Sequence, residues 1–368
     1  MVSDKKAARS CAEMARRRQK CRAVGLARIV ETLCNASANR RLHLAGNIAP
    51  MDMLLHSVGS DDLPGFCACS EDHVELHGAA STPRVSVVLP VHNGAAFLDA
   101  AIASILCQTF RDFELICVDD GSTDETPQIL QRHALADRRI RIITNRPNKG
   151  LPGALNTGFA AARGALHTWT SDDNIARPNM LARLVAALDA DPGVAIAYAD
   201  FSVIDAQGEV TGLQKMGPAS DLLLGNRIGA AFLYRAEVTK ALSGYDEALF
   251  GIEDYDFWLR AVRRFYFVKV EEDLYLYRRH EASLTDRRAL RIHRLGSQIM
   301  RRELAMVPSR AMRARALVEH GLASRLDPRL DMLARGLILS PGLARGRIKA
   351  ILRHLAQHFV RAITRRTG

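Results

Sequence analysis

Between residues 85 and 170 the chain alternates short apolar runs with stretches in which apolar residues recur at helical spacing. The apolar runs cover residues 85–89, 113–118, 140–144 and 165–170, and helical spacing covers residues 97–107, 124–134 and 151–163. Short runs of β-branched and aliphatic residues are typical of buried strands, and Pro90 is expected to close the first of them. Strand–helix–strand units of this length predict an α/β fold with a mostly parallel, doubly wound sheet.

The length of 368 residues allows one large α/β domain with extensions on both sides. We predict an N-terminal extension over residues 1–82 that is partly helical or disordered, an α/β domain over residues 83–288, and a basic helical region over residues 289–368. No apolar run reaches the length of a membrane-spanning helix, and the Lys/Arg-rich N-terminus lacks the apolar segment of a secretory signal. With seven cysteines at no framework spacing, these features predict a cytoplasmic protein.

Positive charge is concentrated near the C-terminus. Residues 286–368 contain 19 Lys/Arg and 5 Asp/Glu, a surplus of 14 that exceeds the net charge of +11 of the whole chain. Residues 345–363 repeat apolar residues at helical spacing among basic ones, which suits a peripheral helix on the anionic inner face of a membrane. A helix packed on the α/β domain or on a second copy has the same pattern, so both interpretations stay open.

Acidic residues follow two of the predicted strands directly. Asp119 and Asp120 come after the second strand, and Asp172 and Asp173 come after the strand that ends at Thr170. Ligands of doubly wound sheets bind beyond the carboxyl ends of the strands, so these acids are candidates for a binding site. Adjacent carboxylates repel each other unless a cation lies between them, and Mg²⁺ or Mn²⁺ would keep positions open for diphosphate oxygens. The alternative is that both segments are ordinary turns that cap the following helices.

Two further segments carry candidate groups. Glu253 and Asp254 stand at the start of a predicted amphipathic helix, where a carboxylate can take a proton from a hydroxyl, and Asp256 is the second candidate base. Acids in a first turn also stabilise a helix through its dipole, which is the structural alternative. His280 follows a strand-like segment, residues 273–277, and is either a phosphate or metal contact or a packed histidine.

Taken in order, these segments resemble family 2 of the inverting glycosyltransferases, which have the GT-A fold. The resemblance covers residues 85–285 and rests on an ordered series of motifs rather than on any one of them. The quoted motifs are Val-Ser-Val-Val-Leu-Pro-Val-His-Asn ending at Asn93, Val-Asp-Asp-Gly-Ser-Thr-Asp ending at Asp124, and Thr-Ser-Asp-Asp-Asn beginning at Thr170. The commonest form of the last motif has an acid at the position of Thr170, and the variant here is similar to a spore-coat polysaccharide transferase subgroup.

The resemblance implies a role for each candidate residue. Asp254 would be the general base, with Glu253 beside it. His280 begins a His-x-x-Ser-x-Thr pattern that the family places near the diphosphate, so the implied site for Mn²⁺ or Mg²⁺ consists of Asp172, Asp173 and His280. The nucleotide-binding residues that it implies are Pro90, Val91, Asn93, Asp119, Asp120, Asn156 and Asp172.

The implied function is inverting transfer of one sugar from a nucleotide-diphosphate donor, with a UDP-sugar favoured, to a hydroxyl of a glycan or lipid-linked acceptor in surface polysaccharide synthesis. The chain lacks the Gln-x-x-Arg-Trp motif of processive synthases, which favours a non-processive enzyme. One alternative is a sugar-phosphate nucleotidyltransferase, although residues 90–94 lack the basic residues of its phosphate-binding loop. The other is a nucleic-acid-binding protein that uses the basic tail, but Phe359 is the single aromatic residue there, so no nucleic-acid partner is expected.

Overall fold

The computed structural model describes residues 82–280, 288–323, 329–345, 347, 349–353 and 356. The N-terminal extension expected over residues 1–82 therefore lies outside the described residues, except for Thr82. The other described residues belong to a single structural unit that begins at Pro83. The division of this unit into an α/β domain and a separate C-terminal region stays a prediction.

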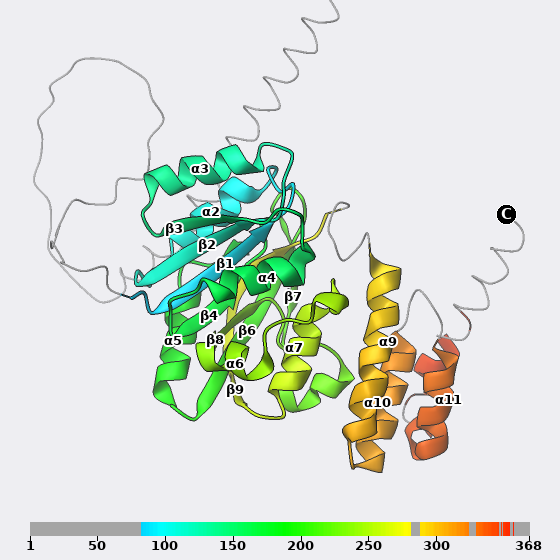
Figure 1. Cartoon of the computed structure of the whole chain (residues 1–368). Coiled ribbons are helices and arrows are strands. Elements are labelled where there is room, and N and C mark those ends of the chain that lie inside the picture. Colours follow the sequence, from blue (N-terminus) through cyan, green and yellow to red (C-terminus); the bar gives the residue numbers. More distant parts are fainter. Residues whose placement is uncertain are drawn as a thin grey trace, which may run out of the picture. The chain divides into compact units, whose positions relative to one another are not determined.

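A nine-stranded sheet forms the centre of the described chain (Figure 1). Its strands are hydrogen-bonded in the order β3-β2-β1-β4-β8-β6-β9-β5, and β7 pairs with β6. The strands are β1 (Val85–Val91), β2 (Phe113–Asp119), β3 (Ile140–Thr144), β4 (Leu166–Trp169), β5 (Ile175–Ala176), β6 (Val194–Ile204), β7 (Val210–Gln214), β8 (Ala231–Arg235) and β9 (Tyr266–Arg278).

The parallel pairing expected from the sequence holds for the first half of the sheet. Strands β3, β2, β1 and β4 pair parallel to one another in that order, and β6 pairs parallel to β9. Strand β8 lies antiparallel between β4 and β6, which makes the sheet mixed. Because β8 is antiparallel to both of its neighbours, β4 and β6 run in the same direction. The carboxyl ends of β1, β2, β4 and β6 therefore lie at one edge of the sheet.

Pro90 lies inside the first strand and does not close it. The carbonyl of Val88 accepts from the N–H of Thr170 on the β4 side, and the carbonyl of Val91 accepts from Asp120 on the β2 side. Alternate residues of a parallel strand bond to the same neighbour. Pro90 therefore faces the β4 side beyond the end of that ladder, where its missing N–H interrupts none of the ladder's hydrogen bonds.

Helices cover both faces of the sheet because successive residues of its strands point to opposite sides. Val87 and Leu89 pack in one core cluster with α2, α3 and α5, whereas Val88 packs in the other with α4, α6 and α7. The helices are α2 (Leu98–Leu106), α3 (Thr126–Ala136), α4 (Gly150–Ala160), α5 (Met180–Ala190), α6 (Ala236–Leu242), α7 (Glu253–Ala261), α9 (Ala289–Met306), α10 (Arg310–Ala323) and α11 (Leu330–Leu339), with 3₁₀ turns η1 (Ala219–Leu224) and η2 (Glu247–Leu249).

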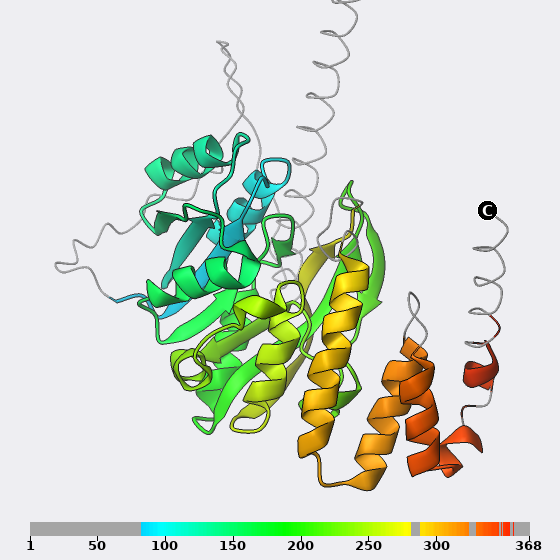
Figure 2. The ribbon, with the colours of Figure 1, turned by 45° about the vertical axis from the view of Figure 1, so that its right-hand side comes forward.

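The C-terminal helices α9, α10 and α11 lie side by side (Figures 1 and 2). Most of the residues of the proposed membrane helix, 345–363, lie outside the described residues. At its described beginning, Ile351 packs against Val318 and Leu333, whereas Leu352 is exposed. This start of the helix therefore packs on α10 and α11. Among the helices that the structure describes, none combines the length and the apolar character needed to cross a bilayer.

Candidate active site at the carboxyl ends of the strands

The loops after β1 and β2 are joined to each other at the sheet edge. Asn93 adopts a left-handed conformation with φ of 56°, and its side-chain oxygen accepts from the N–H of Thr123 at 2.8 Å. Its own N–H donates to the hydroxyl of Ser122 at 3.0 Å. Asp119 in turn accepts from the N–H of Ser122 at 2.9 Å. Asn93 and Asp119, both expected to bind the nucleotide, therefore border the same pair of loops, whereas Val91 is buried in β1.

Asp172 follows β4 and lies against the loop after β1. A Cβ atom on Gly94 would stand 1.8 Å from Oδ2 of Asp172, so only glycine allows this approach. The N–H of Gly94 donates to the hydroxyl of Thr126 at 3.0 Å, which connects the same loop to α3. The structure thus brings the segment after β4 beside the loops after β1 and β2, as their common sheet edge predicts.

The acids of this edge are held in an environment that disfavours their charge. Burial and the neighbouring charge of Asp173 raise the pKa of Asp172 to about 7, with a further contribution from Asp124. Burial also raises the pKa of Asp173, although a hydrogen bond from His280 opposes this rise. His280 Nε2 lies 3.1 Å from Oδ2 of Asp173. His280 and Asp173, both expected at the metal site, are therefore direct partners.

Two carboxylates with raised pKa values suit a divalent cation. Within the described part of the chain, no group of three or more His, Cys, Asp or Glu side chains is arranged to hold a metal ion by itself. Mg²⁺ is commonly bound by one or two carboxylates together with substrate phosphates, so Asp172 and Asp173 fit an ion that arrives with a diphosphate. His280, which contacts Oδ2 of Asp173, would orient this carboxylate for metal binding, as partners of ligating carboxylates do.

Asp120 holds the loop before α4. Its Oδ1 accepts from the side-chain amide of Asn145 and from the N–H of Lys149, both at 2.9 Å, and its Oδ2 accepts from the N–H of Gly150 at 2.8 Å. A carboxylate with three protein donors and 3% exposure has little capacity left for a ligand. The nucleotide contact expected for Asp120 stays a prediction, and the structure itself gives this carboxylate a role in loop architecture.

Asn156 holds the segment that precedes α7. Its side-chain oxygen accepts from the N–H of Tyr245 at 2.8 Å, and its NH₂ group donates to the carbonyl of Tyr245 at 2.9 Å and to Oε1 of Glu247 at 3.2 Å. The amide is therefore used to connect α4 with this segment. The nucleotide contact implied for Asn156 is untested, and these three bonds leave the amide little freedom to make it.

Glu253 and Asp254 form the first turn of α7, as the sequence predicts. Burial and the adjacent Asp254 raise the pKa of Glu253, whose Oε2 accepts from the N–H of Gly251 at 2.5 Å. Burial likewise raises the pKa of Asp254, against the opposing effect of its hydrogen-bond donors. These donors are the N–H of Tyr255 at 2.6 Å and the side-chain amide of Asn226 at 2.9 Å.

Tyr245 joins the end of β4 to α7. Trp169, the last residue of β4, donates from Nε1 to the hydroxyl of Tyr245 at 3.1 Å. The pKa of Tyr245 is raised well above its usual value by burial and by Tyr234, and the negative charge of Asp254 adds to this rise. The Tyr245 ring also stacks on Phe257 of α7, with centroids 4.5 Å apart. The helix that carries Asp254 therefore packs, through this tyrosine, on the end of β4.

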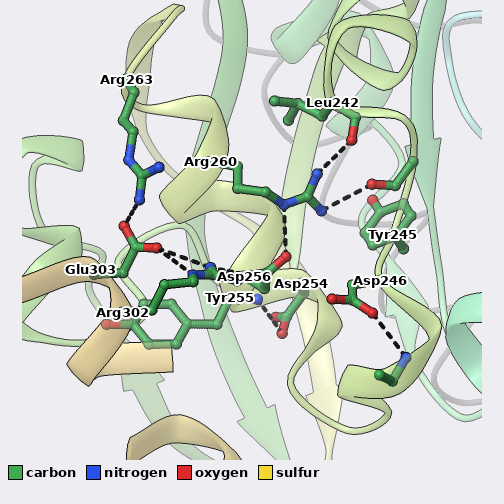
Figure 3. A network of polar contacts seen from close by, with 12 residues as sticks. Leu242, Tyr245, Asp246, Asp254, Tyr255, Asp256, Arg260, Arg263, Arg302 and Glu303 are labelled. Carbon is green, nitrogen blue, oxygen red and sulfur yellow. Dashed lines mark hydrogen bonds and ion pairs between the residues drawn. The ribbon is translucent and has the colours of Figure 1, made fainter. Parts of the chain in front are cut away.

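Asp256 and Trp258 serve the packing of α7. Asp256 has no exposed surface, and its carboxylate accepts from Arg260 and from Arg302, which makes it unsuitable as the alternative base (Figure 3). Trp258 is fully buried and contacts the Phe232 ring edge-on, with centroids 4.8 Å apart. Neither side chain is available to a substrate.

Sequence reasoning missed three residues of this site. Gly94 and Asn226 contact Asp172 and Asp254 across long sequence separations, and no local pattern marks them. Arg278 donates from Nε to the carbonyl of Asp173 at 2.8 Å and lies over the Phe97 ring, 4.7 Å from its centroid. Arg278 stands two residues before His280, and this proximity was the one sequence feature that could have marked it as a site residue.

Comparisons with known proteins identify the family. The model described as glycosyl transferase family 2 matches residues 86–242. The chain is also 30% identical over 216 residues to the uncharacterized glycosyltransferase RT0329 of Rickettsia typhi, an alignment that covers 56% of this chain and 67% of that protein. The chain belongs to glycosyl transferase family 2. This membership favours the transferase interpretation over the nucleotidyltransferase and nucleic-acid-binding alternatives.

Other relatives of this family 2 chain are much longer than the matched part. The chain is 32% identical over 209 residues to the O-antigen biosynthesis protein RfbC of Myxococcus xanthus. This alignment covers 54% of this chain but 16% of RfbC. The chain spans less than a third of the length of several curated relatives that it matches. Among solved structures, residues 1–349 of S. aureus TarS in complex with UDP-GlcNAc match with a TM-score of 0.56 at 16% identity, covering 69% of this chain and 79% of that TarS fragment. This match agrees with the GT-A fold predicted from the sequence.

Proposed function

We propose that the chain is a metal-dependent, inverting and non-processive glycosyltransferase that moves a sugar from a nucleotide-diphosphate donor to an acceptor hydroxyl. The observation that carries the proposal is a pair of acidic centres, one after β4 and one on α7, whose elements are joined by Tyr245 through its hydrogen bond from Trp169 and its stacked ring contact with α7. Asp172 and Asp173 form the centre at the strand edge, and Asp254 forms the centre at the start of α7. A transferase of this kind needs both a site for diphosphate charge and a separate base.

The donor centre consists of the loops after β1, β2 and β4. Asp119 and Asn93 would bind the nucleoside, and Asp172 and Asp173 would hold a divalent ion. Such an ion would supply positive charge for the departing diphosphate. The printed ligands of TarS, UDP and UDP-GlcNAc, support testing UDP-sugars first.

The base centre works through the position and basicity of Asp254. Its raised pKa makes the carboxylate a stronger base than an exposed aspartate, while the amide of Asn226 fixes its orientation. Asp254 would take the proton of the acceptor hydroxyl as the hydroxyl oxygen attacks the anomeric carbon opposite the nucleotide. Glu253, raised in pKa beside it, would be the neutral partner of the pair.

The acceptor is proposed to be a glycan or lipid-linked saccharide of a surface polysaccharide. The name of the relative RfbC supports this class, as does the basic composition of residues 286–368, which would favour an anionic lipid carrier and peripheral contact with the inner membrane face.

The test combines donor binding with turnover. Thermal unfolding is measured with UDP-, GDP- and dTDP-sugars, with and without Mn²⁺, because a bound donor stabilises the fold by mass action. The matching donor should raise Tm only with Mn²⁺, and Asp172→Ala or Asp173→Ala should abolish this rise. Asp254→Asn should keep the rise and lose hydrolysis or transfer of the donor.

Asp246→Asn is the matched control, since Asp246 is an exposed aspartate in the segment before α7 that caps η2, and asparagine caps as well as aspartate does. It should retain both binding and turnover. Normal turnover of Asp254→Asn, or no response to any nucleotide sugar, would contradict the proposal.

A further inference from the structure

A network of buried acids and arginines connects α7 with the C-terminal helix α9 (Figure 3). Asp256 of α7 accepts from Arg260 Nε at 2.7 Å through one oxygen and from Arg302 of α9 through the other. Arg302 also donates from Nε to Oε1 of Glu303 at 3.0 Å, and Glu303 pairs with Arg263, just beyond α7. Asp256 and Glu303 are 0% and 3% exposed, so both carboxylates depend on these arginines for compensation.

Apolar contacts place α9 against the same helix. Three buried residues of α9, Ile299, Met300 and Leu304, belong to the core cluster that contains Phe257 and Trp258. Nearer to the start of α9, a Cβ on Gly296 would lie 3.2 Å from Cδ1 of Ile252, the N-cap of α7. Helix α9 therefore runs beside α7 from its N-cap to beyond its C-terminal end (Figure 2). The residue after Ile252 is Glu253, and the next is Asp254.

The second C-terminal helix, α10, contacts the turn η1, which precedes a hydrogen-bond partner of Asp254. His320 of α10 donates from Nε2 to the carbonyl of Leu223 in η1 at 2.9 Å, since a carbonyl can only accept. Arg315 of α10 lies 3.6 Å from the carboxylate of Asp221 in the same turn. The segment that follows η1 carries Asn226, whose amide donates to Oδ2 of Asp254.

The turn η1 and α7 are also bonded to each other. The hydroxyl of Tyr255 donates to the carbonyl of Leu222 at 2.6 Å, and Tyr255 is the residue after Asp254. The carboxylate of Asp254 is thus held between two supports. One is the first turn of α7, which α9 fixes, and the other is the η1–Asn226 segment, which α10 fixes.

We propose that helices α9 and α10 act as a clamp that sets the position of the Asp254 carboxylate, with Arg302 and His320 as its positioning residues. This inference rests on the proposed function, because it assigns the clamp to the base of that reaction. It makes the C-terminal helices part of the catalytic apparatus and separates their role from the donor centre at Asp172. Displacement of a reacting group by about 1 Å can lower turnover about 100-fold, so a small shift of α7 suffices.

The first test replaces Arg302 by methionine in the full chain. Arg302→Met keeps an apolar stem of similar length but removes the guanidinium that pairs with Asp256 and Glu303. We expect kcat to fall about 10- to 100-fold while the donor-induced rise in Tm and the donor KM stay within about twofold of wild type. Arg302→Lys should recover part of the loss, because a lysine at this position can still pair with Asp256.

Arg301→Met is the matched control on the same helix. Arg301 is 57% exposed and pairs with Asp331 of α11 at 3.4 Å, so it takes no part in the clamp. We expect wild-type kcat for this variant. Equal losses in Arg301→Met and Arg302→Met would show a general effect of α9 stability and would overturn the assignment.

The second test addresses α10. His320→Leu removes the donor to Leu223, whereas His320→Gln places an amide N–H at a similar reach. We expect His320→Leu to lower kcat and His320→Gln to restore most of it. If the leucine variant turns over as the wild type does, the η1 support has no catalytic role.

Hydrogen–deuterium exchange separates failure of the clamp from failure of the proposed function. Arg302→Met should speed exchange in residues 253–262, and His320→Leu should speed exchange in residues 219–227, with exchange in β1 and β2 unchanged. Unaltered exchange in both segments overturns the clamp whatever the enzyme does. A wild-type protein that transfers no sugar overturns the proposed function, while the exchange result still decides whether α9 and α10 hold these segments.

Discussion

The carboxylate of Asp172 occupies the space that a side chain on Gly94 would need. A Cβ built on Gly94 would lie 1.8 Å from Oδ2 of Asp172 and 2.8 Å from Cγ2 of Val91, far inside contact distance. The two residues are 78 positions apart, and their contact joins the loop after β1 to the acidic segment after β4. The geometry of the donor centre therefore depends on the absence of a side chain at Gly94.

Gly94→Ala should consequently disrupt donor binding. The added methyl group must push away the Asp172 carboxylate or the loop, and such overpacking costs about 1–3 kcal/mol of unfolding free energy. We expect a lower Tm and loss of the Mn²⁺-dependent rise in Tm with the nucleotide sugar. Gly212→Ala is the control, because a Cβ at Gly212 meets nothing within 4 Å. The prediction fails if Gly94→Ala binds the donor as the wild type does.

The ionisation of Asp172 predicts a pH-dependent stability of the metal-free protein. Its pKa is 3.8 in the unfolded chain and rises to about 7 in the fold, so the ionised form is disfavoured by folding. Relative to the unfolded chain, the fold favours the protonated form of Asp172. The resulting contribution to the unfolding free energy is fully present below about pH 4, is lost as the pH rises toward 7, and stays lost above pH 7. The loss is at most about 4 kcal/mol, and residual contact of the side chain with water reduces it.

Asp172→Asn removes this dependence. In EDTA, wild type and variant should have similar unfolding free energies at about pH 3.5, and the variant should be the more stable one at pH 8, by urea titration. Asp112→Asn, an exposed substitution just before β2 at the opposite end of that strand, should follow the wild type. Equal stability of Asp172→Asn and wild type at pH 8 would show that Asp172 is not held against its charge.

The fold was predictable where contacts are local. The alternation of short apolar runs with helical spacing predicted β1 to β4 and α2 to α4, because the burial of each element depends on its own residues. The order of β8, β6 and β9 was not predictable. It depends on pairings between strands that are distant in sequence, some of which are parallel and others antiparallel. Pro90 shows that prediction is also limited within a strand. A strand accepts a proline there because the hydrogen-bond ladder with β4 ends before it, and the sequence does not show where that ladder ends.

The candidate site was predictable in its acids but less so in their roles. Asp119 and Asp120 are adjacent and look equivalent, yet Asp119 bonds to its own turn whereas Asp120 binds a loop 25 to 30 residues away. Asp254 and Asp256 are two positions apart, and one of the two arginines that pair with Asp256 comes from the distant helix α9. Such assignments need the tertiary partner, which local spacing does not contain.

Asn226 should control the acid limb of the pH–rate profile. Its amide donates to the ionised form of Asp254, so Asn226→Ala raises the pKa of Asp254 further. A hydrogen bond to a charged group contributes about 1.5–3 kcal/mol, which corresponds to a shift of about one to two pH units. The acid limb of kcat should move up by that amount, with recovery of the rate at alkaline pH. Gln207→Ala, an exposed amide in the turn after β6, is the control, and an unmoved limb would contradict Asp254 as the base.

Asn156→Ala distinguishes the nucleotide contact implied by the sequence from the connecting role seen in the structure. The substitution leaves the N–H and carbonyl of Tyr245 without their side-chain partner, which costs about 1–3 kcal/mol of unfolding free energy. We expect a lower Tm and an unchanged rise in Tm on addition of the donor. Thr157→Ala, the next residue of α4, whose hydroxyl bonds within the helix to Gly153, should change both quantities little. The opposite outcome, an unchanged Tm with a lost donor response, would return Asn156 to the nucleotide site, because only a residue that contacts the donor can alter binding without altering the fold.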